Sequence, residues 1–113
     1  MLKTLGQVRP GAATAVKLYT VPPNKGAVLA NIIACNTDLS AADTFAIYQV
    51  PATITTPTTS HQIASGNIPA SESYIIVAGI SLAADPAGGA VGESIYVISG
   101  SGKVTFTCSG DES

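Results

Sequence analysis

The fold class is decided by the stretch Thr14-Ala-Val-Lys-Leu-Tyr-Thr-Val-Pro-Pro-Asn-Lys-Gly-Ala-Val-Leu-Ala-Asn-Ile-Ile-Ala-Cys35. Its first part, Thr14 to Val21, alternates two sets of side chains with the period of two that is typical of a β-strand. The cluster Pro22-Pro-Asn-Lys-Gly26 then predicts a turn, because proline presets φ while Asn and Gly tolerate positive φ. The last part, Ala27 to Cys35, predicts a second strand that is apolar on both sides, as inside a sandwich.

The period of two continues along most of the chain, and no segment shows the pattern of a long amphipathic helix. Leu2–Val8 predicts an edge strand or a free arm, within an N-terminal segment of residues 1–10. Ser94–Ser99 and Lys103–Ser109 predict a final hairpin across Gly100-Ser101-Gly102. One face of that hairpin carries Val104, Phe106 and Cys108. Further strands are expected at Thr44–Val50, His61–Ile68 and Tyr74–Val77.

Seven or eight short strands, with turn signals about every 8–12 residues, indicate an all-β chain. No internal repeat and no domain boundary is visible in the sequence. We therefore expect one antiparallel β-sandwich domain over residues 1–113, most naturally a jelly roll.

The chain carries little charge for its length. Asp, Glu, Lys and Arg make up 11% of its 113 residues, against about 25% in an ordinary soluble domain. The mean hydropathy is +0.38, yet the longest apolar stretch, Tyr74–Ala84, is shorter than the roughly 20 residues that a membrane-spanning helix needs. Since so few charges leave little polar material for the outside, we expect other protein to cover part of the surface.

Charge and the N-terminal residues also bear on partners and compartment. The net charge of −2 and the scattered basic residues give no reason to expect nucleic acid as a partner. The N-terminal residues lack an apolar signal segment, so we expect synthesis in a cytoplasm. In that reducing compartment Cys35 and Cys108 are expected to be buried free thiols. The alternative is a disulfide, if their two strands face each other.

Few residues in the chain are typical of catalytic or metal sites. His61 is the only histidine, and its place at a loop edge favours a capping or solvated role over catalysis. Asp38 with Asp43, and Asp85 with Glu93, are carboxylate pairs of the kind that a glycosidase needs. The first pair lacks the ligand spacing of a calcium loop. Turn formation by Asp accounts for these carboxylates without a site.

Two other patterns do not point to a ligand. The glycines between Gly79 and Gly92 do not open a helix and lack the Lys-Ser/Thr of a phosphate-binding loop. The chain has no Trp, which gives poor support to a stacking platform for sugars or bases. We therefore predict no catalytic, cofactor-binding or metal-binding residue, no cofactor and no enzymatic activity.

Two segments resemble a group of small virion proteins of tailed phages. One is the strand–turn–strand segment Lys17-Leu-Tyr-Thr-Val-Pro-Pro-Asn-Lys-Gly-Ala-Val-Leu-Ala-Asn-Ile-Ile-Ala-Cys-Asn-Thr37. The other starts at Gly79-Ile-Ser-Leu-Ala-Ala84 and leads to Ser94-Ile-Tyr-Val-Ile-Ser99 and Val104-Thr-Phe-Thr-Cys-Ser-Gly110. Together they cover rather more than half of the chain. The segment Asp85–Glu93 departs from that group, because it is longer and richer in glycine than the tight turn usual there.

The resemblance implies a β-sandwich structural protein on the capsid surface of a virion, made in the host cytoplasm. The function it implies is that of a capsid decoration (cement) protein, a homotrimer that binds the major capsid protein and stabilises the head shell. In that role Met1–Pro10 is expected to pair with an edge strand of the coat protein.

Two other function classes stay open. The first alternative is a tail or head-fibre accessory protein whose loops Pro51–Ser60 and Asp85–Gly92 contact the host surface. A small hydrolase is a third class, for which the sequence shows no nucleophile–base set.

Overall fold

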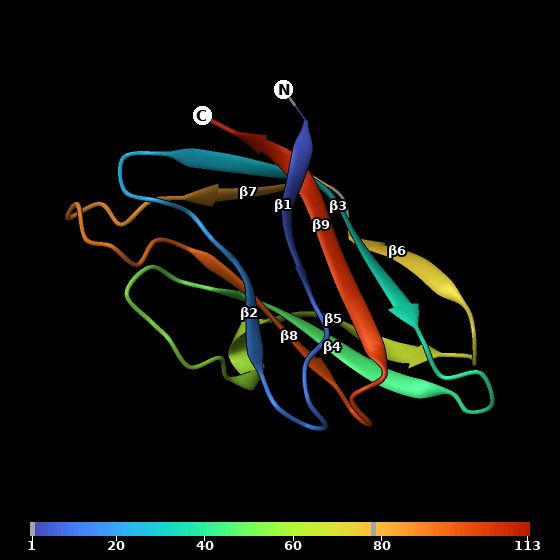
Figure 1. Ribbon diagram of the computed structural model, residues 1–113. Helices are drawn as coiled ribbons and strands as arrows, with labels where there is room; N and C mark the ends of the chain where they lie inside the picture. The colour runs from blue at the N-terminus through green and yellow to red at the C-terminus, as the bar shows by residue number, and fades with distance from the viewer. Residues whose placement is uncertain (1, 78) are drawn as a thin grey trace.

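The computed structural model describes residues 2–77 and 79–113 and shows two antiparallel β-sheets packed against each other (Figure 1). In sheet A the strand order is β1-β9-β3-β6, with β7 also paired to β3, and in sheet B it is β2-β8-β4-β5. A single 3-10 turn, η1, lies between β4 and β5 in the described chain. The elements are β1 (Lys3–Val8), β2 (Val16–Thr20), β3 (Gly26–Asn36), β4 (Asp43–Val50), η1 (Thr59–His61), β5 (Gln62–Ile68), β6 (Ser73–Val77), β7 (Ile80–Ala83), β8 (Ser94–Ser99) and β9 (Val104–Glu112).

The strand order is that of a jelly roll. The chain folds back along itself, so that β1 pairs with β9, β2 with β8, β3 with β6 and β7, and β4 with β5. Two more pairs, β3 with β9 and β4 with β8, join these into the two sheets. The predicted antiparallel sandwich of jelly-roll type is therefore confirmed. The described residues form nine strands instead of seven or eight, because β6 and β7 follow each other along β3.

The core lies between the two sheets and is built from alternate residues of each strand. In β9 the side chains of Val104, Phe106 and Cys108 are fully buried, and the residues between them are only partly buried. The predicted common face of these three residues is thus confirmed. Burial of such a row is the main favourable term for folding, about 1.5–3 kcal/mol for each large apolar side chain.

Only one side of β3 faces the core, although the strand is largely apolar on both sides, as predicted. Leu29, Ile32 and Ala34 are fully buried, but Val28 is 50% exposed. The physical reason is that a sandwich of two layers gives each sheet one inner and one outer side. The outer side of β3 is nevertheless apolar, and this leaves hydrophobic atoms on the surface of sheet A.

The predicted final hairpin is also wrong, because β8 lies in sheet B and β9 in sheet A. The turn between them is held by Asp43, the first residue of β4, whose side chain is 4% exposed. Its carboxylate accepts hydrogen bonds from the Ser99 hydroxyl (2.7 Å), the Ser101 N–H (2.8 Å) and the Lys103 N–H (3.2 Å). The Ser99 hydroxyl oxygen in turn accepts from the Val104 N–H at 3.2 Å. These bonds direct the chain from one sheet to the other.

The N-terminal segment is an edge strand and not a free arm. β1 pairs with β9 in sheet A, while Met1 lies outside the described residues. Gly6 lies directly against the backbone carbonyl of Leu18 in β2, where a Cβ atom would collide. The two sheets therefore approach closely at the side where β1 and β2 meet.

We expect Asp43→Asn to lower the free energy of unfolding by about 1–3 kcal/mol at neutral pH, because the new amide group would face N–H donors. Burial raises the pKa of Asp43, but hydrogen bonds from Ser99, Ser101, Lys103 and Thr44 outweigh burial and bring this pKa below its ordinary value. A depressed carboxylate pKa stabilises the fold above the unfolded-state pKa, and this stabilisation is lost as pH falls through the folded-state pKa.

The measurement is urea-induced unfolding of both proteins from neutral pH down to about pH 2. The stability difference between native protein and variant should shrink toward acid pH. A difference that stays constant across the series would contradict the assigned role of the carboxylate.

Candidate functional site

His61 has a capping role. It ends η1, and its Nδ1 accepts a hydrogen bond from the backbone N–H of Thr58 at 3.1 Å. This bond closes the short turn that precedes β5. The expectation of a capping position is confirmed, and the imidazole is engaged with its own loop.

The carboxylates of Asp38 and Asp43 serve different parts of the backbone. Asp38 accepts from the N–H groups of Ser40 (2.9 Å) and Ala41 (3.3 Å) within its own loop. The hydrogen bond from the Ser40 N–H is the main cause that holds the pKa of Asp38 below its ordinary value. Asp43, by contrast, holds the turn between β8 and β9. Both carboxylates therefore satisfy backbone donors, as turn-forming Asp residues do.

The second carboxylate pair also bonds to backbone groups. Asp85 accepts from the Ala87 N–H at 3.0 Å, and Glu93 accepts from the Ala83 N–H at 2.7 Å. These bonds shape the loop that joins β7 to β8. The turn-forming interpretation of Asp85 is confirmed by this contact.

The two cysteines are free and lie on opposite sides of sheet A. Cys108 of β9 points into the core, and burial raises its pKa to about 11. Cys35 of β3 is only half-buried and pairs in register with Thr105, one of the outward residues of β9. The prediction of free thiols is confirmed, but the prediction that both are buried is wrong for Cys35.

Within residues 2–77 and 79–113 there is no pocket and no group of three or more His, Cys, Asp or Glu side chains that could hold a metal ion. Nor does that part of the chain contain a helix long and apolar enough to cross a membrane.

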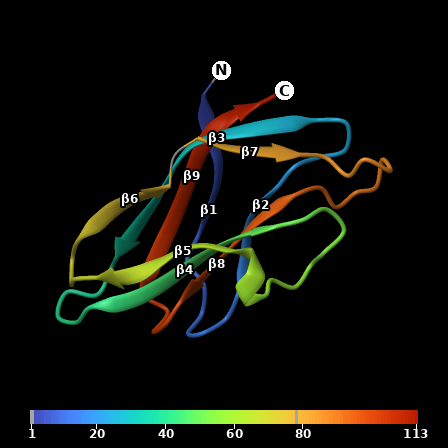
Figure 2. The ribbon, with the colours of Figure 1, turned by 180° about the vertical axis from the view of Figure 1, so that it is seen from behind.

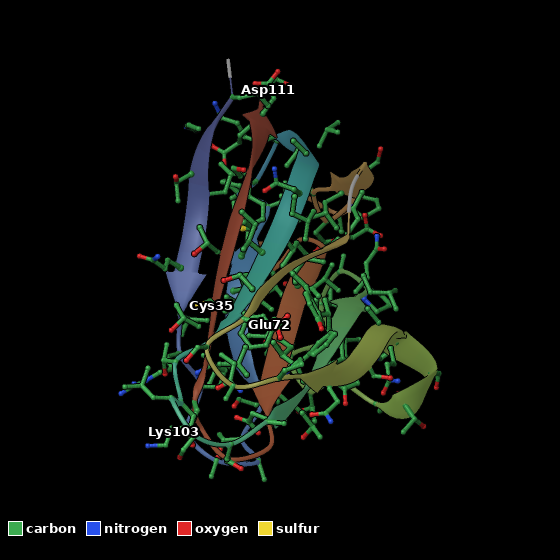
Figure 3. The ribbon with its side chains drawn as sticks, turned by 90° about the vertical axis from the view of Figure 1, so that its right-hand side faces the viewer. Cys35, Glu72, Lys103 and Asp111 are labelled. Carbon is green, nitrogen blue, oxygen red and sulfur yellow. The ribbon has the colours of Figure 1, made fainter. Side chains whose placement is uncertain are left out.

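The outer surface of sheet A is the first part of the candidate site. Its central positions are uncharged, and Ile33 of β3 lies opposite Ile75 of β6, which is 70% exposed. Figure 3 looks toward this sheet, with Asp111 at one end, Lys103 at the other and Cys35 between them. The outward residues in the central part of the sheet include Gln7, Asn31, Ile33, Cys35, Ile75, Thr105, Thr107 and Ser109.

The outer surface of sheet B is also low in charge but less open, since Tyr96 is only 8% exposed. Tyr48 of β4 lies opposite Tyr96 of β8, and Lys17 of β2 lies on the other side of Tyr96. Ala46 and Ile98 form the next pair along these strands. Lys17 is the one charged residue among these positions.

Charge is confined to the loops and strand ends. Each of the five basic and seven acidic residues of the chain lies in a loop or within two residues of the end of a strand. The middle of every strand is uncharged. Apart from Lys17, the central positions of both sheet surfaces can therefore lose water without the large cost of desolvating a charge.

One exposed apolar side chain is held by a rigid loop. Leu39 is 86% exposed at the tip of the loop between β3 and β4. The side chain of Asn36, which is 1% exposed, ties this loop together. Its amide donates to the carbonyl oxygens of Ala41 (3.0 Å) and Ile68 (2.9 Å), and its Oδ1 accepts from the Asp38 N–H (2.9 Å). Leu39 was not among the residues predicted from the sequence to form a site, although polar residues flank this lone leucine.

Four of the five edge strands in the described residues, all except the short β7, are interrupted by a β-bulge. The extra residues are Leu5 in β1, Leu18 in β2, Ile63 in β5 and Ile76 in β6. A bulge kinks the strand and breaks the regular ladder of N–H and C=O groups that another strand would need. The candidate site therefore consists mainly of sheet surfaces, with edges that are protected by geometry instead of charge.

No family model matches the chain, and no curated protein matches it.

The two thiols should differ in reactivity by their position. In the native protein we expect a thiol reagent to modify Cys35 alone, because Cys108 is fully buried and its pKa is raised. Mass spectrometry should show one label per chain before denaturation and two after it. Rapid modification of both thiols in the folded protein would contradict the inward position of Cys108.

Proposed function

We propose that this chain is a structural protein that acts by binding other protein, and that it is a capsid decoration protein of a tailed phage. The partner in this proposal is the major capsid protein. The phage assignment rests on the resemblance of Lys17–Thr37 and of the later strands to small virion proteins. The structural role rests on the chain's own surface.

The observation that supports the proposal best is the absence of charge from the middle of every strand. Protein interfaces are depleted of charged residues at their centre, with polar residues at the rim. Here uncharged sheet surfaces are bordered by charged loops, as at such an interface. Exposed Ile75 and Leu39 supply apolar area near one end of the molecule.

A decoration protein stabilises a shell because it binds the assembled state and not the separated subunits. A rigid binding surface suits this role, since little conformational entropy is lost when it docks. The bonds of Asn36 and Asp38 within their loop, and those of Asp43 across the turn between β8 and β9, provide such rigidity.

The copy number of this chain per coat subunit, measured by quantitative mass spectrometry of purified particles, tests the proposal. We expect a ratio near one to one, because only the shell lattice offers that many equivalent positions. A few copies per hundred coat subunits would instead indicate the tail or head-fibre alternative. Absence from particles would contradict a virion role altogether.

Binding to particles that lack the chain should depend little on salt. Uncharged surfaces are not screened by ions, so the bound fraction should change little between low salt and about 1 M NaCl. A steep loss of binding with salt would show that charged loops, and not the sheet surfaces, make the contact. A sandwich domain of similar size that is absent from the particles serves as the control for nonspecific adsorption.

A further inference from the structure

The edge strand β5 has the longest regular stretch that is open to another strand. Its bulge lies at Ile63, near the beginning of the strand. From Ala64 to Ile68 the pairing with β4 is continuous, and β5 pairs with no strand on its other side. In the shorter edge strands the bulges at Leu5, Leu18 and Ile76 leave at most three consecutive regular residues.

The β5 edge is also free of the charges that usually keep edges apart. Its sequence, Gln62-Ile-Ala-Ser-Gly-Asn-Ile68, has no charged residue, whereas β1 carries Lys3 and β2 carries Lys17. Charged edge residues, lysine above all, oppose pairing with a second chain. At β7, which continues the edge of sheet A, the Gln49 amide already bonds to the Ser81 carbonyl at 3.3 Å.

Small side chains make close approach to β5 feasible. A Cβ atom on Gly66 would lie 3.1 Å and 3.3 Å from two ring atoms of Phe45, so the ring of Phe45 covers this glycine from the neighbouring strand. Such a cross-strand aromatic cover keeps a glycine-containing edge ordered. Ala64 and Ser65 complete a stretch that presents backbone with little side-chain bulk.

We propose that β5 pairs antiparallel with β5 of a second copy of this chain. The two-fold axis passes through Gly66, the midpoint of the regular stretch, and sheet B then continues across both copies. In this register Ser65 lies opposite Asn67 of the second copy, and Ala64 lies opposite Ile68. Each copy contributes the same β5 residues, so the contact is self-complementary. Once two copies have paired, neither β5 edge is open to a third.

The same register accounts for two exposed apolar side chains near this edge. Beyond the paired stretch, Pro69 of one copy comes opposite Ile63 of the other, and Ile63 is 42% exposed in the single chain. The loop of Leu39 is bound to the turn that follows β5, through a 2.9 Å hydrogen bond from the Ser71 N–H to the Asp38 carbonyl. Figure 2 shows this loop and the turn together at one end of β5. In this register the loop of Leu39 therefore lies at the end of β5 where Ile63 of the second copy comes.

A two-fold contact gives a dimer, in place of the homotrimer that the resemblance implies. The proposed contact joins only copies of this chain, so the dimer proposal does not rest on the proposed function. The mass of the isolated protein in solution therefore tests the dimer, whereas the copy number in particles tests decoration.

The experiment measures the mass of the full chain by analytical ultracentrifugation between micromolar and millimolar concentrations. We expect a dimer for the native protein and a monomer for Ser65→Lys, since two lysines would flank the two-fold axis. The control Thr55→Lys adds the same charge at an exposed loop position and should stay dimeric. Thermal unfolding of each variant confirms that it is folded.

A second variant tests the register and distinguishes it from a defect in folding. Asn67→Glu alone should also be monomeric, because two glutamates would then flank the axis. An equimolar mixture of Ser65→Lys and Asn67→Glu should form a one-to-one heterodimer, in which the one introduced lysine faces the one introduced glutamate. A native monomer, a native trimer, a dimeric Ser65→Lys or no heterodimer in the mixture would each overturn the proposal.

Discussion

The structure depends on the buried carboxylate of Asp43. A charge with so little access to water is stable only if donors surround it, and the turn between β8 and β9 supplies them from Ser99, Ser101 and Lys103. This requirement sends β8 and β9 into different sheets. β9 can then lie between β1 and β3, where it joins the first strand to the centre of sheet A. One side chain at the start of β4 thus helps to set the connectivity of both sheets.

Local patterns in the sequence predicted the strands but not all of their partners. The alternation in Val104–Ser109 and the turn at Pro22–Gly26 depend on neighbouring residues only, and both are found, with Asn24 at φ 60°. The hairpin across Gly100–Gly102 was wrong because a turn motif specifies a change of direction, not the sheet in which the next strand lies. That choice depends on Asp43, which is 56 residues from Ser99 in the sequence. For a related reason the sequence did not reveal that β3 buries only one of its two apolar sides, since the number of layers follows from the whole fold.

The sequence predicted what kind of site to expect, but not which residues would form it. The low fraction of charged residues indicated that protein covers part of the surface, and the position of every charge near a strand end agrees with that reading. Which residues face outward could not be read from the sequence, because each bulge shifts the alternation by one residue. Cys35 shows this limit: its strand was identified, but its outward side follows from the pairing of β3 with β9. Leu39 was not identified because the rigidity of its loop comes from Asn36, whose partner Ile68 is distant in sequence.

A chain with so few charges needs another way to prevent uncontrolled pairing of its sheet edges. Charged edge residues would serve that purpose, but they would also border the uncharged surfaces that we assign to protein contacts. Bulges protect an edge without adding charge, since they distort the backbone ladder itself. The protection extends only as far as the distortion, and in β5 the bulge lies near the start of the strand and spares Ala64–Ile68. Low charge and bulged edges together therefore leave β5 with the longest regular stretch open to strand pairing, while charge stays near the strand ends.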